Sequence, residues 1–181
     1  MEKIEILKFG DELWDRVINY AETCSWGAGR VLAGKMREND FEANERVVVA
    51  LHDGDIAAFC TFSDRDELPP EYDFGPFVGF VFVDEKFRGR RLSGKLIEAA
   101  CGLAREQGFT AIYLMSGEVG LYEKYGFRKI GDYGTIYGSV EQLFARICDF
   151  VEVINECGNR HFKYCVKDGA AHTAPVEGIR P

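Results

Sequence analysis

The chain has 181 residues, which is enough for one domain with a complete hydrophobic core or for one domain with an appendage. Its 22 lysines and arginines stand against 30 aspartates and glutamates, so the formal net charge is −8. Such an acidic balance argues against a nucleic-acid binder, because those proteins gain most of their affinity from cations that neutralise phosphates. No apolar run approaches the ~20 residues of a membrane helix, and the N-terminus lacks the apolar core of a signal peptide. We therefore expect a cytoplasmic protein without a membrane partner.

The first third of the chain predicts one strand, two helices and a hairpin. Alternating apolar and polar residues indicate strands, and apolar residues at helical spacing indicate amphipathic helices. The Asp53-Gly54 pair favours a tight turn between two short β-favouring runs. The predicted elements are strands at 3–9, 46–51 and 56–62, a helix that Asp11 caps, and a second helix at about 30–38.

The pattern changes after a charged loop at 64–76 that holds three prolines. Residues 77–83 are nearly continuous in apolar residues, which suits a strand that is covered on both faces. A helix with an apolar stripe follows and is expected to end at Gly108. The remaining predicted elements are this helix at 92–107, strands at 110–115, 127–130 and 142–147, a short helix at 119–125 and a final helix at 150–156.

This order of elements predicts the fold class. The strand, helix and strand in the middle of the chain imply a parallel pair, and the hairpin before them implies antiparallel neighbours. The expected fold is α/β, with a mixed, mostly antiparallel sheet that has a central parallel pair and is flanked by helices. We expect one domain over 1–147 and a C-terminal extension over 148–181 that consists of one helix and a loosely ordered tail.

The turn between strand 77–83 and the next helix has the composition of a phosphate site. The first N–H groups of a helix have no partners within the helix and lie at the positive end of its dipole. Gly89 allows the backbone to approach a ligand closely. Arg88, Arg90 and Arg91 add positive charge, and the Ser93 hydroxyl is a further donor. On these residues alone, a solvated basic loop remains an equal alternative.

Two segments together resemble the GNAT (GCN5-related N-acetyltransferase) superfamily. Residues 78–97 resemble its central motif, a strand followed by Arg/Gln-x-x-Gly-x-Gly/Ala and a helix. Arg88 matches the first motif position, whereas Arg91 and Ser93 stand where the family has glycine and a smaller residue. Residues 120–127 (GLYEKYGF) resemble a second segment, although Ser116 and Gly117 stand where the family often has asparagine. The resemblance covers roughly residues 3–147.

The resemblance implies an acyl-CoA-dependent N-acetyltransferase. Such an enzyme transfers the acetyl group of acetyl-CoA to a primary amine of a small molecule, amino acid or peptide by direct attack in a ternary complex. In this chain, backbone N–H groups around Val81 to Val83 would hold the pantetheine and polarise the thioester carbonyl. Tyr122 would be the catalytic acid that protonates the departing thiolate. The implied cofactor-binding residues are Val81, Phe82, Val83, Arg88, Gly89, Arg90, Arg91, Leu92, Ser93 and Tyr122.

Two other functions stay open at this point. The arginine at position 91 and the missing asparagine also fit a module that binds acyl-CoA for sensing without turnover. A zinc-stabilised interaction domain would use Cys148, Cys157, His161 and Cys165, but zinc sites usually have more tightly paired cysteines. We therefore expect no metal, and we interpret the six cysteines as reduced thiols. Because many relatives dimerise, the resemblance also allows a homodimer.

The catalytic base and the acceptor pocket are less well determined. Asp84, Glu85 and Glu118 are candidates for the base, and none is preferred. Trp26 and Trp14 are candidates for lining the acceptor pocket, with core packing an equal alternative for Trp14. The loop at 64–76 contains acids that suit a cationic acceptor or a solvated surface. These acids are Asp64, Asp66, Glu67, Glu71 and Asp73.

Overall fold

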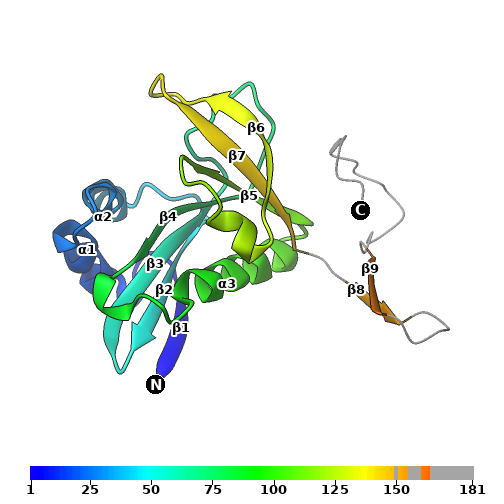
Figure 1. Ribbon diagram of the computed structural model, residues 1–181. Helices are drawn as coiled ribbons and strands as arrows, with labels where there is room; N and C mark the ends of the chain where they lie inside the picture. The colour runs from blue at the N-terminus through cyan, green and yellow to red at the C-terminus, as the bar shows by residue number, and fades with distance from the viewer. Residues whose placement is uncertain (149–150, 155–159, 164–181) are drawn as a thin grey trace. The chain divides into compact units, whose positions relative to one another are not determined.

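Figure 1 shows a computed structural model of the chain, in which residues 1–148, 151–154 and 160–163 are described. The chain divides into two compact units, Met1–Cys148 and Asp149–Pro181. No helix among the described residues is long and apolar enough to cross a membrane.

The strands of Met1–Cys148 form one seven-stranded sheet in the order β1-β2-β3-β4-β5-β7-β6. Only β4 and β5 pair in parallel, and the other neighbours in this sheet are antiparallel. The predicted mixed sheet with a central parallel pair is therefore confirmed. The strands are β1 (Glu2–Leu7), β2 (Arg46–His52), β3 (Asp55–Ser63), β4 (Phe77–Val83), β5 (Ala111–Ser116), β6 (Arg128–Gly134) and β7 (Val140–Ile147).

Helices cover both faces of the β1–β4 half of this sheet (Figure 1). Val48 and Ala50 of β2 pack in a core with α3, whereas Val47 and Val49 pack in a second core with α1 and α2. Successive side chains of a strand point to opposite faces, so a run of apolar residues supplies two cores at once. The helices are α1 (Trp14–Thr23), α2 (Ala28–Glu38) and α3 (Leu92–Glu106).

The segment between β3 and β4, predicted as a loop at 64–76, is anchored by apolar side chains. Leu68 is only 5% exposed and belongs to a third group of buried residues with Phe77, Tyr113 and Leu143, against which Phe74 packs. Because this anchor holds the loop against the sheet, Asp66, two residues before Leu68, lies beside Gly79 near the start of β4.

Two predicted helices differ from the structure. The short helix expected over 119–125 is a 3₁₀ turn over Tyr122–Tyr125 that ends at Gly126, whose φ is +83°. The helix expected over 150–156 is wrong, because Val151–Ile154 is a strand (β8) that pairs antiparallel with β9, Arg160–Lys163. β8 contains three β-branched residues, a composition that favours strands. The tail expected to be loosely ordered lies outside the described residues.

Candidate active site

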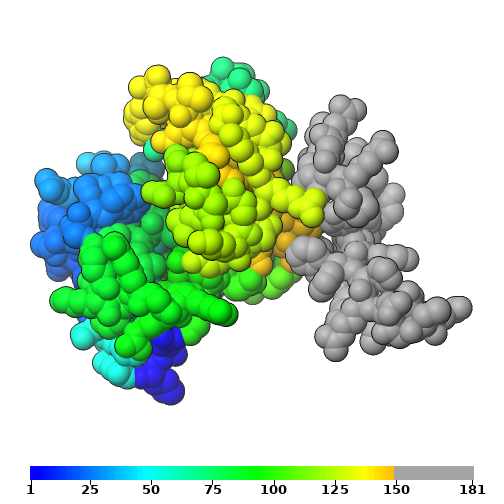
Figure 2. Space-filling model, in the orientation of Figure 1, coloured from blue at the N-terminus to red at the C-terminus, as the bar shows by residue number. Residues whose placement is uncertain are grey.

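The parallel strands β4 and β5 meet at one residue pair and then diverge. Phe77 pairs with Tyr113, and the Tyr113 N–H donates to the Pro76 carbonyl oxygen at 2.8 Å. Beyond this pair a cavity of about 1000 Å³ opens between the two strands. On the face of Met1–Cys148 in Figure 2, the surface of residues just after β4 (green) lies beside that of residues just after β5 (yellow-green).

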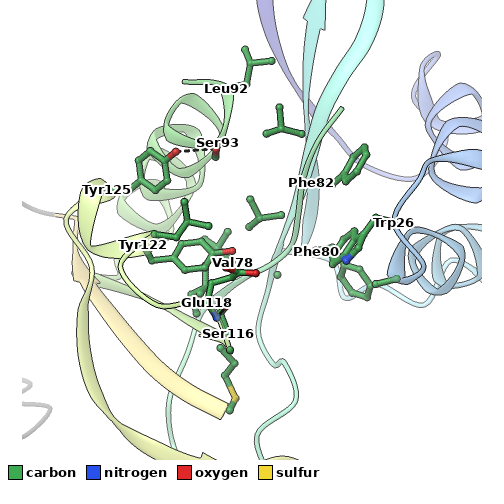
Figure 3. A pocket seen from close by; sticks show the side chains of 18 of the residues that line it. Trp26, Val78, Phe80, Phe82, Leu92, Ser93, Ser116, Glu118, Tyr122 and Tyr125 are labelled. Atoms are coloured by element: carbon green, nitrogen blue, oxygen red, sulfur yellow. Dashed lines mark hydrogen bonds between the residues drawn. The ribbon is translucent and has the colours of Figure 1, made fainter. Parts of the chain in front are cut away.

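The cavity brings the predicted site residues together, with one exception. Arg90 does not line it, whereas the other predicted contacts do. Figure 3 looks into the cavity, where Tyr122 and Tyr125 lie across β4 from Trp26, Phe80 and Phe82. The predicted residues that line the cavity are Val81, Phe82, Val83, Arg88, Gly89, Arg91, Leu92, Ser93 and Tyr122.

A bulge interrupts β4 in the cavity wall. The pairing of β3 with β4 shifts by one residue between Phe59 and Thr61, so that Phe80 and Val81 together stand opposite one residue of β3. Phe80 has a φ of +49°. A bulky side chain rarely adopts this left-handed conformation, and such strained residues are concentrated at functional sites.

The bulge decides which backbone groups face the cavity. The Asp84 N–H donates to the Ala57 carbonyl oxygen of β3 at 3.0 Å. Backbone N–H groups alternate between the two edges of a strand, so those of Val83 and Val81 point to the opposite edge, toward the gap that β5 leaves. This edge therefore presents two amide donors to a ligand in the cavity.

The turn between β4 and α3 presents further donors. The first intrahelical backbone bond of α3 runs from the Lys95 N–H to the Arg91 carbonyl oxygen at 3.2 Å. The N–H groups of Leu92, Ser93 and Gly94 therefore have no acceptor within the helix. Arg91 is the N-cap residue and has a left-handed backbone, with φ +58° and ψ +30°. Such a helix start offers unpaired donors and a positive charge, which together favour an anion.

One serine hydroxyl and one tyrosine hydroxyl are in contact at this helix start. The Ser93 Oγ lies 3.0 Å from the Tyr125 Oη in a partly buried contact. A Cβ atom on Gly94 would lie 3.2 Å from the Tyr125 ring. Position 94 therefore accommodates only a glycine without displacing the ring. Tyr125 packs against the core that α3 belongs to and also lines the cavity beside the helix start.

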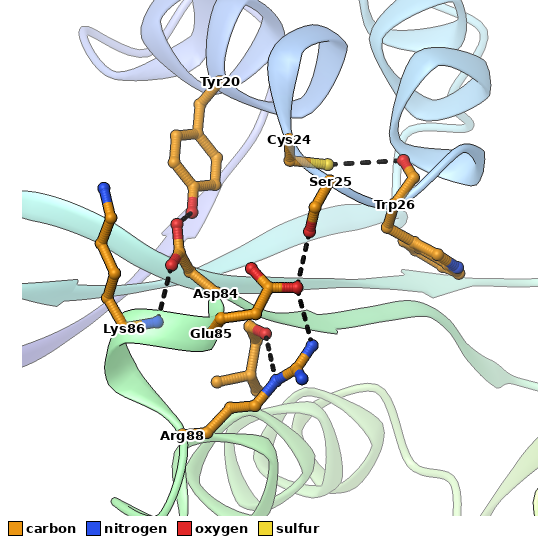
Figure 4. A network of polar contacts seen from close by, with 9 residues as sticks. Tyr20, Cys24, Ser25, Trp26, Asp84, Glu85, Lys86 and Arg88 are labelled. Carbon is orange, nitrogen blue, oxygen red and sulfur yellow. Dashed lines mark hydrogen bonds and ion pairs between the residues drawn. The ribbon is translucent and has the colours of Figure 1, made fainter.

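Polar contacts attach this turn to α1 and to the connection between α1 and α2 (Figure 4). The Tyr20 hydroxyl donates to Asp84 Oδ2 at 2.6 Å, and the Ser25 hydroxyl donates to Glu85 Oε1 at 2.7 Å. Arg88 donates to the same Glu85 oxygen at 2.9 Å and, through Nε, to the Val83 carbonyl oxygen at 3.4 Å. These contacts hold the basic turn against the end of β4.

The same contacts make two of the candidate bases weak. The hydrogen bond from Tyr20, supported by the Lys86 N–H, holds the pKa of Asp84 below its ordinary value. The hydrogen bond from Ser25 does the same for the pKa of Glu85. A carboxylate with a lowered pKa is a poorer proton acceptor at neutral pH.

Comparisons with known proteins give the family. The sequence profile described as the acetyltransferase (GNAT) family matches residues 14–127. This match covers more than half of the chain and includes β4, the basic turn, α3 and Tyr122. The chain belongs to the GNAT acetyltransferase family. A comparison with curated protein sequences found no significant match.

Solved structures agree with the GNAT fold. Aminoglycoside 6'-acetyltransferase type Ii superposes with a TM-score of 0.63 at 16% identity, over 81% of this chain and 97% of the other. An aminoglycoside 6'-N-acetyltransferase in complex with coenzyme A gives 0.61 at 13% identity, over 81% and 97%. A GNAT acetyltransferase from Elizabethkingia anophelis with acetyl-CoA bound gives 0.55 at 13%, over 81% and 97%. At these identities the likeness shows the fold alone.

Tyr122, in the second GNAT segment, is nearly buried at the cavity wall. It is 7% exposed and packs edge-on against Phe127, with the ring centroids 6.1 Å apart. Burial raises the pKa of Tyr122 to about 12, and a hydrogen bond with Ser116 opposes that rise. The phenol is therefore protonated throughout the neutral range and has a proton to donate.

The two tryptophans have different surroundings. Trp14 is 3% exposed, and its Nε1 donates to the Met36 carbonyl oxygen at 3.1 Å, so it is a core residue. Trp26 is 36% exposed and stacks on Phe82 at a ring-centroid distance of 6.1 Å in the cavity wall. Of the two candidates, Trp26 is the residue that lines the cavity.

Besides Glu85 of the basic turn and Glu118, three further carboxylates line the cavity. Asp66 and Glu67 come from the loop after β3, and Glu141 comes from β7. The sequence placed the first two among five loop acids without separating them from a solvated surface. What distinguishes them is their neighbour Leu68, whose burial directs this part of the loop toward the sheet.

The remaining candidate residues are the cysteines and the histidine of a possible zinc site. Within 1–148 and the two short strands that follow, no group of three His, Cys, Asp or Glu side chains is arranged to hold an ion. Cys157 and Cys165 of the candidate zinc set lie outside the described residues. Cys24, Cys60, Cys101 and Cys148 are free thiols, and the last three are buried.

Proposed function

We propose that this GNAT protein is an N-acetyltransferase that transfers the acetyl group of acetyl-CoA to a primary amine of a small molecule, amino acid or peptide. The proposal rests mainly on one observation. A single cavity combines the unpaired N–H groups at the start of α3 with the inner edge of β4 beyond the bulge. An enzyme of this kind needs the first set to hold a diphosphate and the second to polarise a carbonyl.

The diphosphate of acetyl-CoA would bind at the β4–α3 turn. The N–H groups of Leu92 and Ser93 would donate to its oxygens, and Gly89, with φ +81°, would allow close approach. Arg88, whose side chain is 61% exposed, would reach the phosphates without leaving a buried partner unpaired. Arg90 belongs to the same turn but does not line the cavity, so it would contribute mainly at long range.

The acetyl group would lie beside the bulge. The N–H groups of Val81 and Val83 would hold the pantetheine and donate to the thioester oxygen, where negative charge develops as the amine attacks. Donors that are already fixed by the strand need no reorganisation during the reaction. Holding the amine and the thioester in line would supply a further several kcal/mol of the barrier.

Tyr122 would complete the transfer. As the carbon–sulfur bond breaks, the thiolate would take the proton of the Tyr122 hydroxyl, which is held near the buried end of the cavity. The same low-polarity surroundings raise the pKa of a thiol beside it, so the thiolate becomes a stronger base there. The catalytic acid is therefore a weak acid, and the thiol that receives its proton is also weakly acidic.

Thiol release from acetyl-CoA tests this function. We would assay the full chain with an aminoglycoside, a polyamine, a free amino acid and a peptide with a free N-terminus, and measure CoA affinity by calorimetry. We expect turnover with at least one amine. Tyr122→Phe should lower kcat by ~10²-fold and leave CoA affinity within about threefold, because only the proton donor is removed.

The contrary results separate two failures. CoA binding without turnover on any amine would favour the sensing module. If calorimetry detects no CoA binding, and the double change Arg88→Glu and Arg90→Glu alters no measured property of the protein, both the acetyltransferase and the acyl-CoA-sensing module are excluded.

A further inference from the structure

One acidic side chain lies against β4 directly before the bulge. A Cβ atom built on Gly79 would lie 3.0 Å from the Thr61 Oγ1 and 3.6 Å from the Asp66 Oδ2. The Asp66 carboxylate therefore sits over the one residue of β4 that has no side chain. Thr61 pairs with Gly79 and follows Phe59 by two residues, so this contact lies on the face of the sheet that α1 and α2 cover.

This position is opposite to that of the departing thiol. Tyr122 and α3 belong to the core on the other face of the sheet, and the cavity passes between β4 and β5 to reach both. An acetyl-CoA held by α3 would therefore present its carbonyl at the bulge from one face. An amine would reach that carbonyl from the face on which Asp66 lies, where Trp26 and Phe80 also line the cavity.

The spacing fits one amine nitrogen between the carboxylate and the carbonyl. Gly79 precedes Val81 by two residues, and because the bulge at Phe80 lies between them, their separation is somewhat below the roughly 7 Å that two residues span in a regular strand. A nitrogen that is ~3 Å from the carbonyl carbon and ~3 Å from the carboxylate oxygen spans nearly the same length. Asp84 and Glu85 lie at the far end of β4 and are already hydrogen-bonded, so they do not compete for this place.

The surroundings of Asp66 favour proton uptake at neutral pH. Burial raises the pKa of Asp66 to about 7, and the negative charges of Glu67 and Glu141 add to that rise. The Glu67 N–H, which donates to the carboxylate, and the positive charge of Lys35 on α2 act in the opposite direction. Lys35 is itself paired with Asp40 at 3.0 Å. A base with a pKa near the working pH is the most effective proton acceptor.

We propose that Asp66 is the catalytic base of this acetyltransferase and takes a proton from the ammonium form of the acceptor amine. The role rests on the function proposed above. Glu67 and Glu141 form the rest of an acidic wall that attracts the ammonium group before it is deprotonated.

With Asp66 as the base and Tyr122 as the acid, the protons of the reaction balance. The acceptor enters as R–NH3⁺ and gives one proton to Asp66. The neutral nitrogen then attacks the thioester carbon, a carbon–nitrogen bond forms and the carbon–sulfur bond breaks. The thiolate takes the Tyr122 proton, and the second proton lost by the nitrogen restores the phenol. Asp66 releases its proton to solvent, so the products are the amide, CoA–SH and one proton.

The test compares the pH dependence of kcat/KM for the wild type and Asp66→Asn, with the amine that the wild type acetylates fastest. For the wild type we expect an acidic limb with an apparent pKa near 7. Asp66→Asn should lower kcat/KM by ~10²-fold or more at pH 7.5 and abolish the limb, while CoA affinity stays within about threefold. Asp73→Asn, which removes the same charge from an exposed position of the same loop, should leave both activity and limb unchanged.

A second variant separates a base from a structural anchor. Glu67→Gln removes the like charge that raises the pKa of Asp66, so the limb should move to lower pH. If the wild type turns over but Asp66→Asn keeps its activity within threefold and its limb, the proposal is wrong while the acetyltransferase function stands. If the wild type acetylates no amine, the function fails and the role of Asp66 fails with it.

Discussion

Arg91 shows the conformational free energy that a non-glycine residue costs at a glycine position of the GNAT motif. It stands where the motif has glycine, and its φ of +58° is a left-handed conformation that glycine adopts without strain. For other residues this conformation costs roughly 1–2 kcal/mol. The turn therefore keeps the geometry that the motif needs, and the side chain adds a positive charge at the start of α3.

The comparison of Arg91→Gly with Arg91→Ala isolates this strain. Both variants lose the charge, but only alanine keeps a Cβ atom in the left-handed conformation. We expect Arg91→Gly to be more stable than Arg91→Ala by ~1 kcal/mol in urea unfolding. CoA affinity should fall by the same factor in both. Equal stabilities would mean that the turn relaxes to another conformation when the arginine is removed.

Asp66 also predicts a pH-dependent stability. Its pKa is raised from 3.8 to about 7 in the folded chain, so the folded state holds this proton over a range in which the unfolded state has lost it. The stability that protonated Asp66 contributes is complete below pH 4 and is lost as the pH rises through 7. Relative to Asp66→Asn, the wild type should lose on the order of 2 kcal/mol between pH 4.5 and pH 8.

Urea unfolding of both proteins at several pH values measures this difference. The expected loss is about half of the full linkage value, because Asp66 is only partly removed from solvent. Asp73→Asn, at an exposed position, should follow the wild type at every pH. A constant difference between the wild type and Asp66→Asn would show that the pKa of Asp66 is ordinary.

At the scale of elements, the hydrogen bond from Tyr20 of α1 to Asp84 connects a helix on one face of the sheet to the basic turn. Tyr20→Phe removes this bond from an ionised acceptor, and we expect the free energy of unfolding to fall by ~1–2 kcal/mol at pH 7. Because the bond lowers the pKa of Asp84, its stabilisation is present above the ordinary pKa and is lost as the pH falls through the lowered one. CoA affinity should also decrease, since the turn is less firmly held.

The matched control is Tyr72→Phe. Tyr72 is 37% exposed, and its hydroxyl makes no hydrogen bond to a described residue, so this change should leave stability and CoA affinity nearly unchanged. If Tyr20→Phe binds CoA as tightly as the wild type, the network around Asp84 stabilises the fold without positioning the turn.

The sequence predicted those elements whose patterns are local. β4 and α3 follow from an apolar run and an apolar stripe, and the hairpin of β2 and β3 follows from Asp53-Gly54. The bulge at Phe80 could not be predicted, because it depends on the pairing of β4 with β3. Asp11 does not cap α1 as expected. Its carboxylate accepts from the Lys8 N–H instead, and Leu13 is the N-cap residue.

The residues of the candidate site also fall into two groups, those that a local sequence pattern predicts and those that depend on contacts between distant segments. The basic turn and Tyr122 could be found because the motif positions are consecutive in the sequence. Asp66 could not be separated from Asp73 by composition, since both are acids of one loop. Only the burial of Leu68 and the missing side chain of Gly79 bring Asp66 to the cavity. Contacts between distant segments therefore decide the acceptor side, where local patterns carry little information.

At the scale of the molecule, the net charge is −8, yet one end of the cavity is lined by arginines. Arg88 and Arg91 line one end of the cavity, and Asp66, Glu67 and Glu141 line another part of its wall. The arrangement suits an anionic cofactor and a cationic acceptor that enter from different faces of the sheet. The overall charge thus describes the surface average, whereas function depends on how charges are divided along one cavity.

The distribution of buried residues predicts that Met1–Cys148 suffices for CoA binding. Among the described residues, the three core clusters and the residues that line the cavity lie within this unit. The last core residue, Cys148, is 2% exposed, and its N–H and carbonyl bond to Thr110 and Arg105, both at 2.8 Å. A chain shortened after residue 150 should therefore unfold cooperatively, with a Tm within about 3 °C of the full chain, and keep its CoA affinity within about threefold.

A chain shortened after Gly138 is the matched comparison. It lacks β7, which pairs with β5 on one side and with β6 on the other. Without β7, β6 has no neighbour that connects it to the rest of the sheet. We expect this shorter chain to show no cooperative thermal transition and no CoA binding. If the chain shortened after residue 150 behaved in the same way, the cavity described here would be incomplete without residues 151–181, and the proposed site would have to include them.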